Sequence, residues 1–277
     1  MRAAVVQLNS TEDKERNLSA ADSLVRAAAS DGAELVVLPE KFNVLGTADH
    51  LRAEAEPLDG PTLRWASGLA SELGIWLVAG SIVERVEGEE KLRNTCALVD
   101  PGGSIAAIYR KIHMFDVDVG GTSYRESDSE SPGDEIVLAD AGELPLGLAI
   151  CYDLRFPELF RILALRGALA FALPAAFTLF TGKDHWEVLL RARAIENQAF
   201  VIAAGQFGTH PPGHQSFGRS MIVDPWGIPL AIAPDRECYV SADLDFAAVE
   251  RVRERLLSLG NRRPTAYRWP EMIEALR

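Results

Sequence analysis

The sequence contains few cysteines, and this scarcity limits how the chain can be stabilised. Cys96, Cys151 and Cys238 are widely separated in 277 residues, and none has CxxC spacing. Three such cysteines are too few for a disulfide framework, and they suit a reducing compartment. The cysteine count therefore predicts a cytoplasmic protein that relies on its hydrophobic core.

Long apolar runs are also missing. The most apolar stretch, GALAFALPAAF at residues 167–177, is far shorter than the roughly 20 residues of a transmembrane helix. At the amino terminus, polar Gln7 and Asn9 follow an apolar run too short for a signal peptide. We therefore expect a soluble intracellular chain that does not associate with a membrane.

Positive charge is outnumbered by negative charge. The chain has 28 Lys and Arg against 40 Asp and Glu, which gives a net charge of −12. Binding to nucleic acid requires a surplus of basic side chains to neutralise phosphates, so no nucleic-acid partner is expected. An anionic substrate would have to be bound by local cations acting against the overall field.

Short aliphatic runs alternate with amphipathic stretches along the chain, and the alternation predicts an α/β fold. The pattern predicts strands at residues 3–8, 34–40, 75–84, 169–174, 200–207 and 237–245, helices at 17–31, 62–73, 157–168, 185–198 and 247–259, and hairpins at 96–111 and 220–233. No linker or repeat divides the chain, so residues 1–277 are predicted to form one domain. Residues 260–277 are less regular, and we expect this tail to pack on the surface or on a partner subunit.

Three chemically distinct side chains follow predicted strands. Cys151 ends the apolar run LPLGLAIC, Glu40 follows ELVVLP, and Lys111 follows the second arm of the first hairpin. Ligands of α/β sheets bind beyond the carboxyl ends of strands, so these groups can meet although they are distant in sequence. A thiol nucleophile, a carboxylate that moves its proton and an ammonium that stabilises an oxyanion would form an acyl-transfer site.

Each of these residues also has a structural interpretation. Cys151 can simply pack in the core, Glu40 can form a surface ion pair with Lys41, and Lys111 can be a solvated hairpin end. A metal site is not expected, because His210 and His214 flank Pro-Pro-Gly and cannot share a helical face as zinc ligands.

Three separated segments together resemble a known family. LPEKFN, YRKIHMFDVDV and AICYDLRFPE are similar to the signature segments of the nitrilase superfamily of carbon–nitrogen hydrolases, and they occur in the same order. The resemblance implies an αββα sandwich that assembles into homodimers or larger homo-oligomers, without a metal or organic cofactor. It also implies that Glu40 is the general base and acid, Lys111 the electrostatic stabiliser and Cys151 the nucleophile, and that Glu126 is a second glutamate that positions the substrate and the lysine.

Within this superfamily, the sequence most resembles the amidase branch that contains deaminated-glutathione amidase and ω-amidase. That resemblance implies a small amide substrate that carries a carboxylate. Arg155 is the candidate to bind the carboxylate, although it could instead form a structural ion pair with Asp153 or Glu158. The backbone N–H of Tyr152 is expected to face the oxyanion, and the pocket mouth is expected at two residues that follow a strand, Phe177 and Thr178.

Other functions stay open at this point. An N-carbamoyl amino-acid amidohydrolase would release carbon dioxide together with ammonia, and a true nitrilase would convert a nitrile to an acid. A third alternative, from a different class, is a non-catalytic oligomeric binding protein. The simultaneous presence of Glu40, Lys111, Glu126 and Cys151 argues against that alternative, because such a protein would not need four interdependent polar groups.

Overall fold

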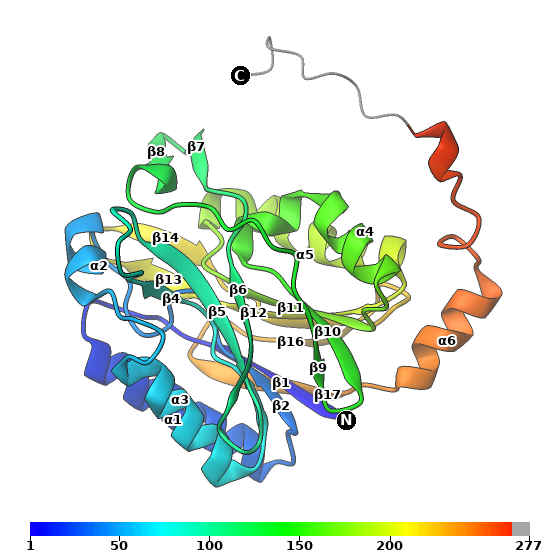
Figure 1. Ribbon diagram of the computed structural model, residues 1–277, viewed down its shortest axis with the longest axis horizontal. Coiled ribbons are helices and arrows are strands. Elements are labelled where there is room, and N and C mark those ends of the chain that lie inside the picture. The colour runs from blue at the N-terminus through cyan, green and yellow to red at the C-terminus, as the bar shows by residue number, and fades with distance from the viewer. Residues whose placement is uncertain (268–277) are drawn as a thin grey trace.

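The computed structural model describes residues 1–267, which form two facing β-sheets with helices on both outer faces (Figure 1). The first sheet contains β17 (Cys238–Asp243), β1 (Arg2–Gln7), β2 (Leu35–Val37), β3 (Trp76–Val78), β4 (Ile82–Glu84), β5 (Arg93–Val99) and β6 (Ile105–Arg110). The second sheet, in spatial order, contains β16 (Pro229–Ile232), β15 (Met221–Val223), β12 (Phe200–Gly205), β11 (Ala170–Ala175), β10 (Leu144–Leu148) and β9 (Leu138–Ala141).

Two pairs of helices complete the four layers. Helices α1 (Lys14–Ser30) and α3 (Pro61–Leu73) cover the first sheet, and α4 (Pro157–Leu165) and α5 (Leu179–Asn197) cover the second (Figure 1). The predicted αββα sandwich is thus confirmed. Strand β1 illustrates why its sequence is continuously apolar: Ala3 and Val5 belong to the core between the sheets, whereas Ala4 and Val6 belong to the core under α1 and α3.

Parallel pairing determines where the site forms. Strands β1, β2 and β3 are mutually parallel neighbours in the first sheet, as are β10, β11 and β12 in the second. Their carboxyl ends therefore open toward the same end of the sandwich, where an isolated bridge between Leu8 and Gln206 links the two sheets. Glu40 follows β2, Cys151 follows β10, and Phe177 follows β11.

The predicted strand at residues 75–84 is interrupted. It forms β3 and β4, which both pair with β5, with a register that shifts by one residue between them. Gly80 has a φ of 47°, and a Cβ there would lie 2.0 Å from the carbonyl oxygen of Pro39. The close approach of the two backbones at this interruption requires glycine.

Other predicted boundaries also differ from the structure. Helix α5 begins six residues before the predicted 185, and the last helix, α6 (Phe246–Arg255), ends four residues before the predicted 259. The prediction missed α2 (Ala48–Glu54), the hairpin of β7 (Asp116–Val119) and β8 (Thr122–Arg125), and the hairpin of β13 (Phe207–His210) and β14 (His214–Phe217). These elements are short and largely polar, so they lack the apolar periodicity from which the prediction was made.

The carboxyl-terminal part lies at one end of the molecule, outside the four layers (Figure 1). Residues 260–267 are mostly exposed, and Tyr267 retains 63% of its accessible surface. The rest of the predicted tail, residues 268–277, lies outside the described residues. Packing of the tail onto a partner subunit therefore stays a prediction.

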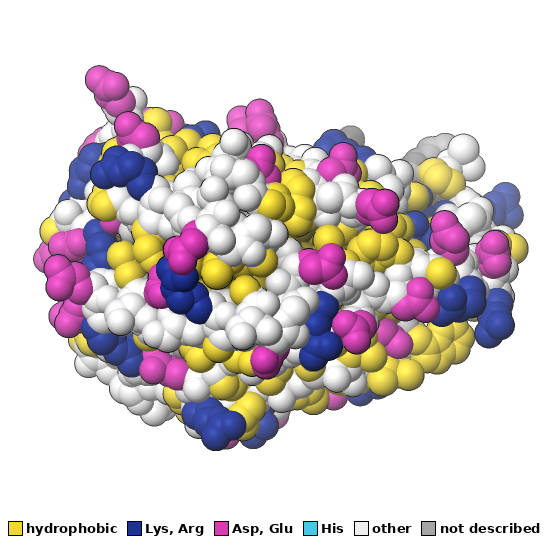
Figure 2. Space-filling model, turned by 90° about the horizontal axis from the view of Figure 1, so that it is seen from below, with side chains coloured by type: hydrophobic (Ala, Val, Ile, Leu, Met, Phe, Trp, Pro, Cys, Tyr) yellow, Lys and Arg dark blue, Asp and Glu magenta, His cyan; other side chains and the backbone are white. Residues whose placement is uncertain are grey.

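Surface charges of both signs are mixed on the face seen in Figure 2, and hydrophobic side chains lie between them. No helix within residues 1–267 combines the length and the apolar character that crossing a membrane requires.

Candidate active site

The backbone turns sharply at Cys151. This residue follows β10 and opens a short 3-10 helix, Cys151–Arg155, with a φ of 46°. A non-glycine residue in the left-handed region is strained, and such strain is concentrated at functional sites. The turn takes the Cys151 side chain out of the strand pattern and places it against a cavity while the residue stays 8% exposed.

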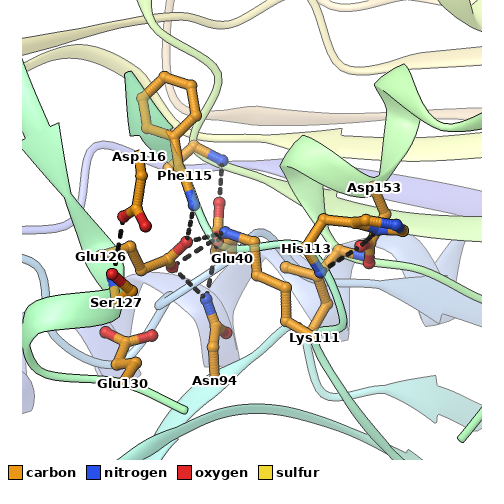
Figure 3. Close-up of polar contacts among 12 residues, drawn as sticks. Glu40, Asn94, Lys111, His113, Phe115, Asp116, Glu126, Ser127, Glu130 and Asp153 are labelled. Carbon is orange, nitrogen blue, oxygen red and sulfur yellow. Dashed lines mark hydrogen bonds and ion pairs between the residues drawn. The ribbon is translucent and has the colours of Figure 1, made fainter. Parts of the chain in front are cut away.

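A fully buried carboxylate, that of Asp153, stabilises this turn. It accepts hydrogen bonds from the backbone N–H of Ile150 at 2.8 Å, from the Tyr109 hydroxyl at 2.6 Å and from His113 Nδ1 at 2.7 Å. Figure 3 shows the contact between His113 and Asp153, with Lys111 next to it. The bond from Ile150 fixes the residue immediately before Cys151, so Asp153 determines the direction of the thiol.

Glu40 lies at the centre of the polar cluster in Figure 3. The residue is 4% exposed, and both carboxylate oxygens accept hydrogen bonds. Oε1 accepts from Asn94 Nδ2 at 2.8 Å and from Lys111 Nζ at 3.1 Å, while Oε2 accepts from the N–H of Ala176 at 2.8 Å. The surface ion pair with Lys41 that the sequence left open is absent from residues 1–267.

Lys111 bridges two carboxylates. Its ammonium lies 3.1 Å from Glu40 Oε1, and 2.9 and 2.8 Å from the two oxygens of Glu126. Glu126 also accepts from the backbone N–H of Phe115 at 2.8 Å. Lys111 is 2% exposed, so the alternative of a solvated hairpin end is wrong.

The pKa values follow from burial and from these neighbours. Burial alone would lower the pKa of Lys111, but Glu126 and Glu40 raise it well above its ordinary value. Burial would raise the pKa of Glu126, but Lys111 and Lys41 lower it to about 2. Burial and the neighbouring Glu40 raise the pKa of the Cys151 thiol well above its ordinary value, although Lys111 opposes them. At neutral pH the site therefore holds a charged ammonium next to a protonated thiol.

The cavity has a volume of about 300 Å³ and is open to solvent. The structure brings all eight residues that the sequence analysis selected to its wall: Glu40, Lys111, Glu126, Cys151, Tyr152, Arg155, Phe177 and Thr178. Their individual roles stay predictions. A cavity of this size suits a small molecule, and its polar groups converge on the thiol.

Arg155 projects into the cavity without a carboxylate partner among residues 1–267. Its guanidinium lies 4.9 Å from the Phe177 ring centroid, 5.9 Å from that of Tyr152 and 3.3 Å from His185 Nδ1. The alternative of an ion pair with Asp153 or Glu158 is therefore wrong for the described part of the chain. The carboxylate of Asp153 instead accepts hydrogen bonds from Tyr109 and His113.

Several residues of the site were not predicted from the sequence. Asn94, on β5, is 1% exposed and donates to both Glu40 and Glu126, at 2.8 and 3.3 Å. Lys41 and Glu130 form a buried ion pair in the cavity wall. A polar residue within the apolar run NTCALV was a usable signal for Asn94, whereas no local pattern distinguishes Glu130 from a solvated acid.

His210 and His214 face each other across the β13–β14 hairpin as a register pair. Within the described part of the chain, no group of three or more His, Cys, Asp or Glu side chains is arranged to hold a metal ion. The expected absence of metal and cofactor stays a prediction from the sequence.

Comparison with known proteins places the chain in a family. Residues 2–254 match the carbon-nitrogen hydrolase family. Omega-amidase NIT2 of Homo sapiens is 40% identical over 267 residues, which cover 96% of each chain. Deaminated glutathione amidase of Bos taurus is 42% identical over 272 residues, 95% of this chain and 82% of that protein.

A solved structure agrees with the sequence comparison. The NitFhit protein of C. elegans superposes with a TM-score of 0.90 at 38% identity, over 96% of this chain. The chain spans 66% of the length of NitFhit. The predicted resemblance is therefore confirmed: this chain belongs to the carbon–nitrogen hydrolase family, within the nitrilase superfamily, and is a hydrolase of non-peptide carbon–nitrogen bonds.

Proposed function

We propose that the enzyme is an amidase that hydrolyses a small carboxylate-bearing amide through a thioester on Cys151. The observation that carries the proposal is the arrangement at the cavity: a strained cysteine lies beside Glu40, which is hydrogen-bonded to a buried, charged Lys111. The same three residue types are those that acyl transfer requires. The names of the human and bovine relatives support an amide substrate.

The first half-reaction forms the thioester. Glu40 takes the proton of the Cys151 thiol as sulfur attacks the carbonyl carbon, and the carbonyl oxygen becomes an oxyanion. Lys111 and the N–H of Tyr152 stabilise this charge. When the C–N bond breaks, Glu40 returns the proton to the nitrogen, which leaves as ammonia or an amine.

The second half-reaction regenerates the enzyme. Glu40 takes a proton from water as the water oxygen attacks the thioester carbonyl. The C–S bond then breaks, the acid leaves, and the proton on Glu40 returns to sulfur. The raised pKa of Cys151 supports this role for Glu40, because a thiol that is protonated at rest needs a base during attack.

Arg155 supplies the specificity in this proposal. Its guanidinium, which has no carboxylate partner among residues 1–267, would bind the substrate carboxylate by charge-assisted hydrogen bonds next to the rings of Phe177 and Tyr152. Thr178, at the same wall, is 9% exposed and would border the entrance.

The proposal is tested by measuring ammonia release over a panel of ω-amides, deaminated glutathione, N-carbamoyl amino acids and nitriles. Hydrolysis of the carboxylate-bearing amides, with protection of Cys151 from alkylation by those amides, is the expected result. Release of carbon dioxide with ammonia would identify the carbamoyl alternative, and acid formed directly from a nitrile would identify a nitrilase. Alkylation of Cys151 without protection by any amide, together with no turnover, would favour the non-catalytic alternative.

We also propose that two copies of the chain associate through an apolar surface patch on the second sheet's helical layer, here called the α5 patch. It consists of Val188, Ile195, Trp226 and Ile228, which are 66%, 47%, 56% and 52% exposed. The turn between β15 and β16 packs on α5 through a bond from Arg191 Nε to the Gly227 carbonyl, so these side chains lie on one face. An exposed patch of this kind is typical of an interface.

Substituting Val188→Glu tests the proposed association. A charge in an apolar interface should separate a dimer into monomers. The molar mass is measured by light scattering coupled to size-exclusion chromatography. A wild-type chain that is monomeric, or a variant whose mass is unchanged, would contradict the proposal. The cytoplasmic location stays a prediction from composition.

A further inference from the structure

The cavity wall contains a second buried lysine that the proposed reaction does not use. Lys41 directly follows Glu40, has a φ of 49°, and donates its backbone N–H to Ser81 Oγ at 3.0 Å. Its side chain is only 12% exposed, and its ammonium lies 2.6 Å from Glu130 Oε1 and 3.7 Å from Glu126 Oε1. An ammonium is thus held within reach of a carboxylate that binds Lys111.

Glu130, the partner of Lys41, is also buried. It is 2% exposed, and its backbone N–H donates to the Glu126 carbonyl at 3.0 Å, which places both acids on one turn. Its second oxygen, Oε2, is buried and has no hydrogen-bond partner among residues 1–267. Removing a carboxylate from water is costly, and a buried ion pair usually adds little net stability. The pair is therefore better explained by a role in the site than by a contribution to folding.

The charges form a row of alternating sign. Glu40 contacts Lys111, Lys111 contacts Glu126, Glu126 faces Lys41, and Lys41 contacts Glu130. Figure 3 shows Glu40, Lys111, Glu126 and Glu130 in this cluster. In such a row each inner charge lies between two opposite charges, and the terminal Glu130 is the charge that fixes the position of Lys41.

We propose that the Lys41–Glu130 ion pair is a positioning device, in which Glu130 holds the Lys41 ammonium away from Glu126 so that Glu126 stays bound to Lys111. This inference rests on the proposed amidase function for its kinetic consequence. Lys41 and Lys111 lie 3.7 and 2.9 Å from the same oxygen, Glu126 Oε1. Without Glu130, Lys41 would compete with Lys111 for that oxygen. Lys111 would then move toward Glu40, and the closer positive charge would make Glu40 a weaker base.

The kinetic test is Glu130→Gln, which removes the charge and nearly conserves the shape. Burial raises the pKa of Glu130 to about 7, although Lys41 opposes this, so the wild type is best assayed at about pH 8. We expect kcat to fall about tenfold, which corresponds to about 1.4 kcal/mol, with KM within about twofold of wild type. A KM effect with unchanged kcat would instead make the pair part of the substrate site and would overturn the inference.

A matched control is available elsewhere in the chain. Glu56 is 5% exposed, lies 2.7 Å from Lys14 in a comparable ion pair, and does not line the cavity. Glu56→Gln should lose similar stability without the loss of kcat. Equal losses of kcat in both variants would show that the effect of Glu130→Gln is structural.

A second readout does not depend on amide turnover. The alkylation rate of Cys151, followed on its peptide by mass spectrometry, reports the pKa of the thiol. Removing the negative charge of Glu130 should lower this pKa and shift the alkylation profile to lower pH. The neutral double variant Lys41→Met with Glu130→Leu should return the profile toward wild type, because a positive and a negative charge are removed together.

The two readouts separate the possible failures. An alkylation profile that is unchanged in Glu130→Gln would overturn the inference, because the row would then not couple Glu130 to the site. A wild-type enzyme that releases no ammonia from any amide would contradict the proposed function, whereas the expected alkylation shift would still support the electrostatic coupling of Lys41 and Glu130 to Cys151.

Discussion

Replacing Arg155 by alanine tests the substrate assignment most directly. The guanidinium is half buried and lies against aromatic rings and His185, without a carboxylate partner in the described residues. Its removal therefore leaves no protein acid unpaired, and the measured loss reports the interaction with the substrate. Loss of a charge-assisted hydrogen bond costs about 1.5–3 kcal/mol. Because Arg155 is partly solvated, we expect the lower half of this range.

That free energy corresponds to a decrease of about 10- to 40-fold in kcat/KM for a carboxylate-bearing amide, mostly through KM. The assay compares glutaric acid monoamide with pentanamide, in which a methyl group replaces the carboxylate. Ammonia release from pentanamide should change by less than about twofold in Arg155→Ala. Arg255→Ala removes an exposed cation that lies outside the cavity and outside the α5 patch, and it serves as the control for general charge effects.

Equal losses on the two amides would refute the reasoning. In that case Arg155 would support the cavity through its packing on Phe177 and Tyr152, and the substrate carboxylate would have to be bound elsewhere. A selective loss on the carboxylate-bearing amide would identify Arg155 as the specificity residue.

Three further outcomes follow from the contacts. Cys151→Ser should abolish turnover while leaving the urea midpoint nearly unchanged; wild-type activity would end its assignment as nucleophile. Asp153→Asn should lower the free energy of unfolding by about 2–3 kcal/mol, because the amide cannot accept all the hydrogen bonds that converge there; an unchanged urea curve would contradict this. Between pH about 4.5 and 7, native Glu130 retains a proton that the unfolded chain releases. The free energy of unfolding should therefore fall as pH rises through this window. Urea titrations at several pH values should show a smaller fall in Glu130→Gln than in the wild type.

Much of the architecture could be predicted from local patterns. Strand β1 and helix α1 follow from apolar spacing, and Gly74, with a φ of 66°, ends α3 where the sequence placed a helix end. The break in β3–β4 could not be predicted, because it depends on the approach of Gly80 to Pro39, a residue 41 positions away. The two missed hairpins are polar and gain their order from contacts across the cavity, such as that between Tyr124 and His214.

For the site too, some properties could be predicted from the sequence and others required the structure. The sequence by itself determined which groups could do the chemistry, because Glu40, Lys111 and Cys151 each follow a strand and lie in segments that resemble one family. It also indicated that a cation near Cys151 was available for an anionic substrate. These conclusions need only residue identity and local order along the chain.

Only the tertiary structure decided how those groups are charged and what holds them. Asn94, Asp153, Lys41 and Glu130 come from different segments, and each contacts a residue far away in sequence, such as Tyr109 for Asp153. Electrostatic interactions depend on distance and on burial, and neither quantity is encoded in the neighbouring residues of a chain. The protonated thiol, the charged lysine and an Arg155 without a carboxylate partner among residues 1–267 therefore became visible only when the sheets were packed together.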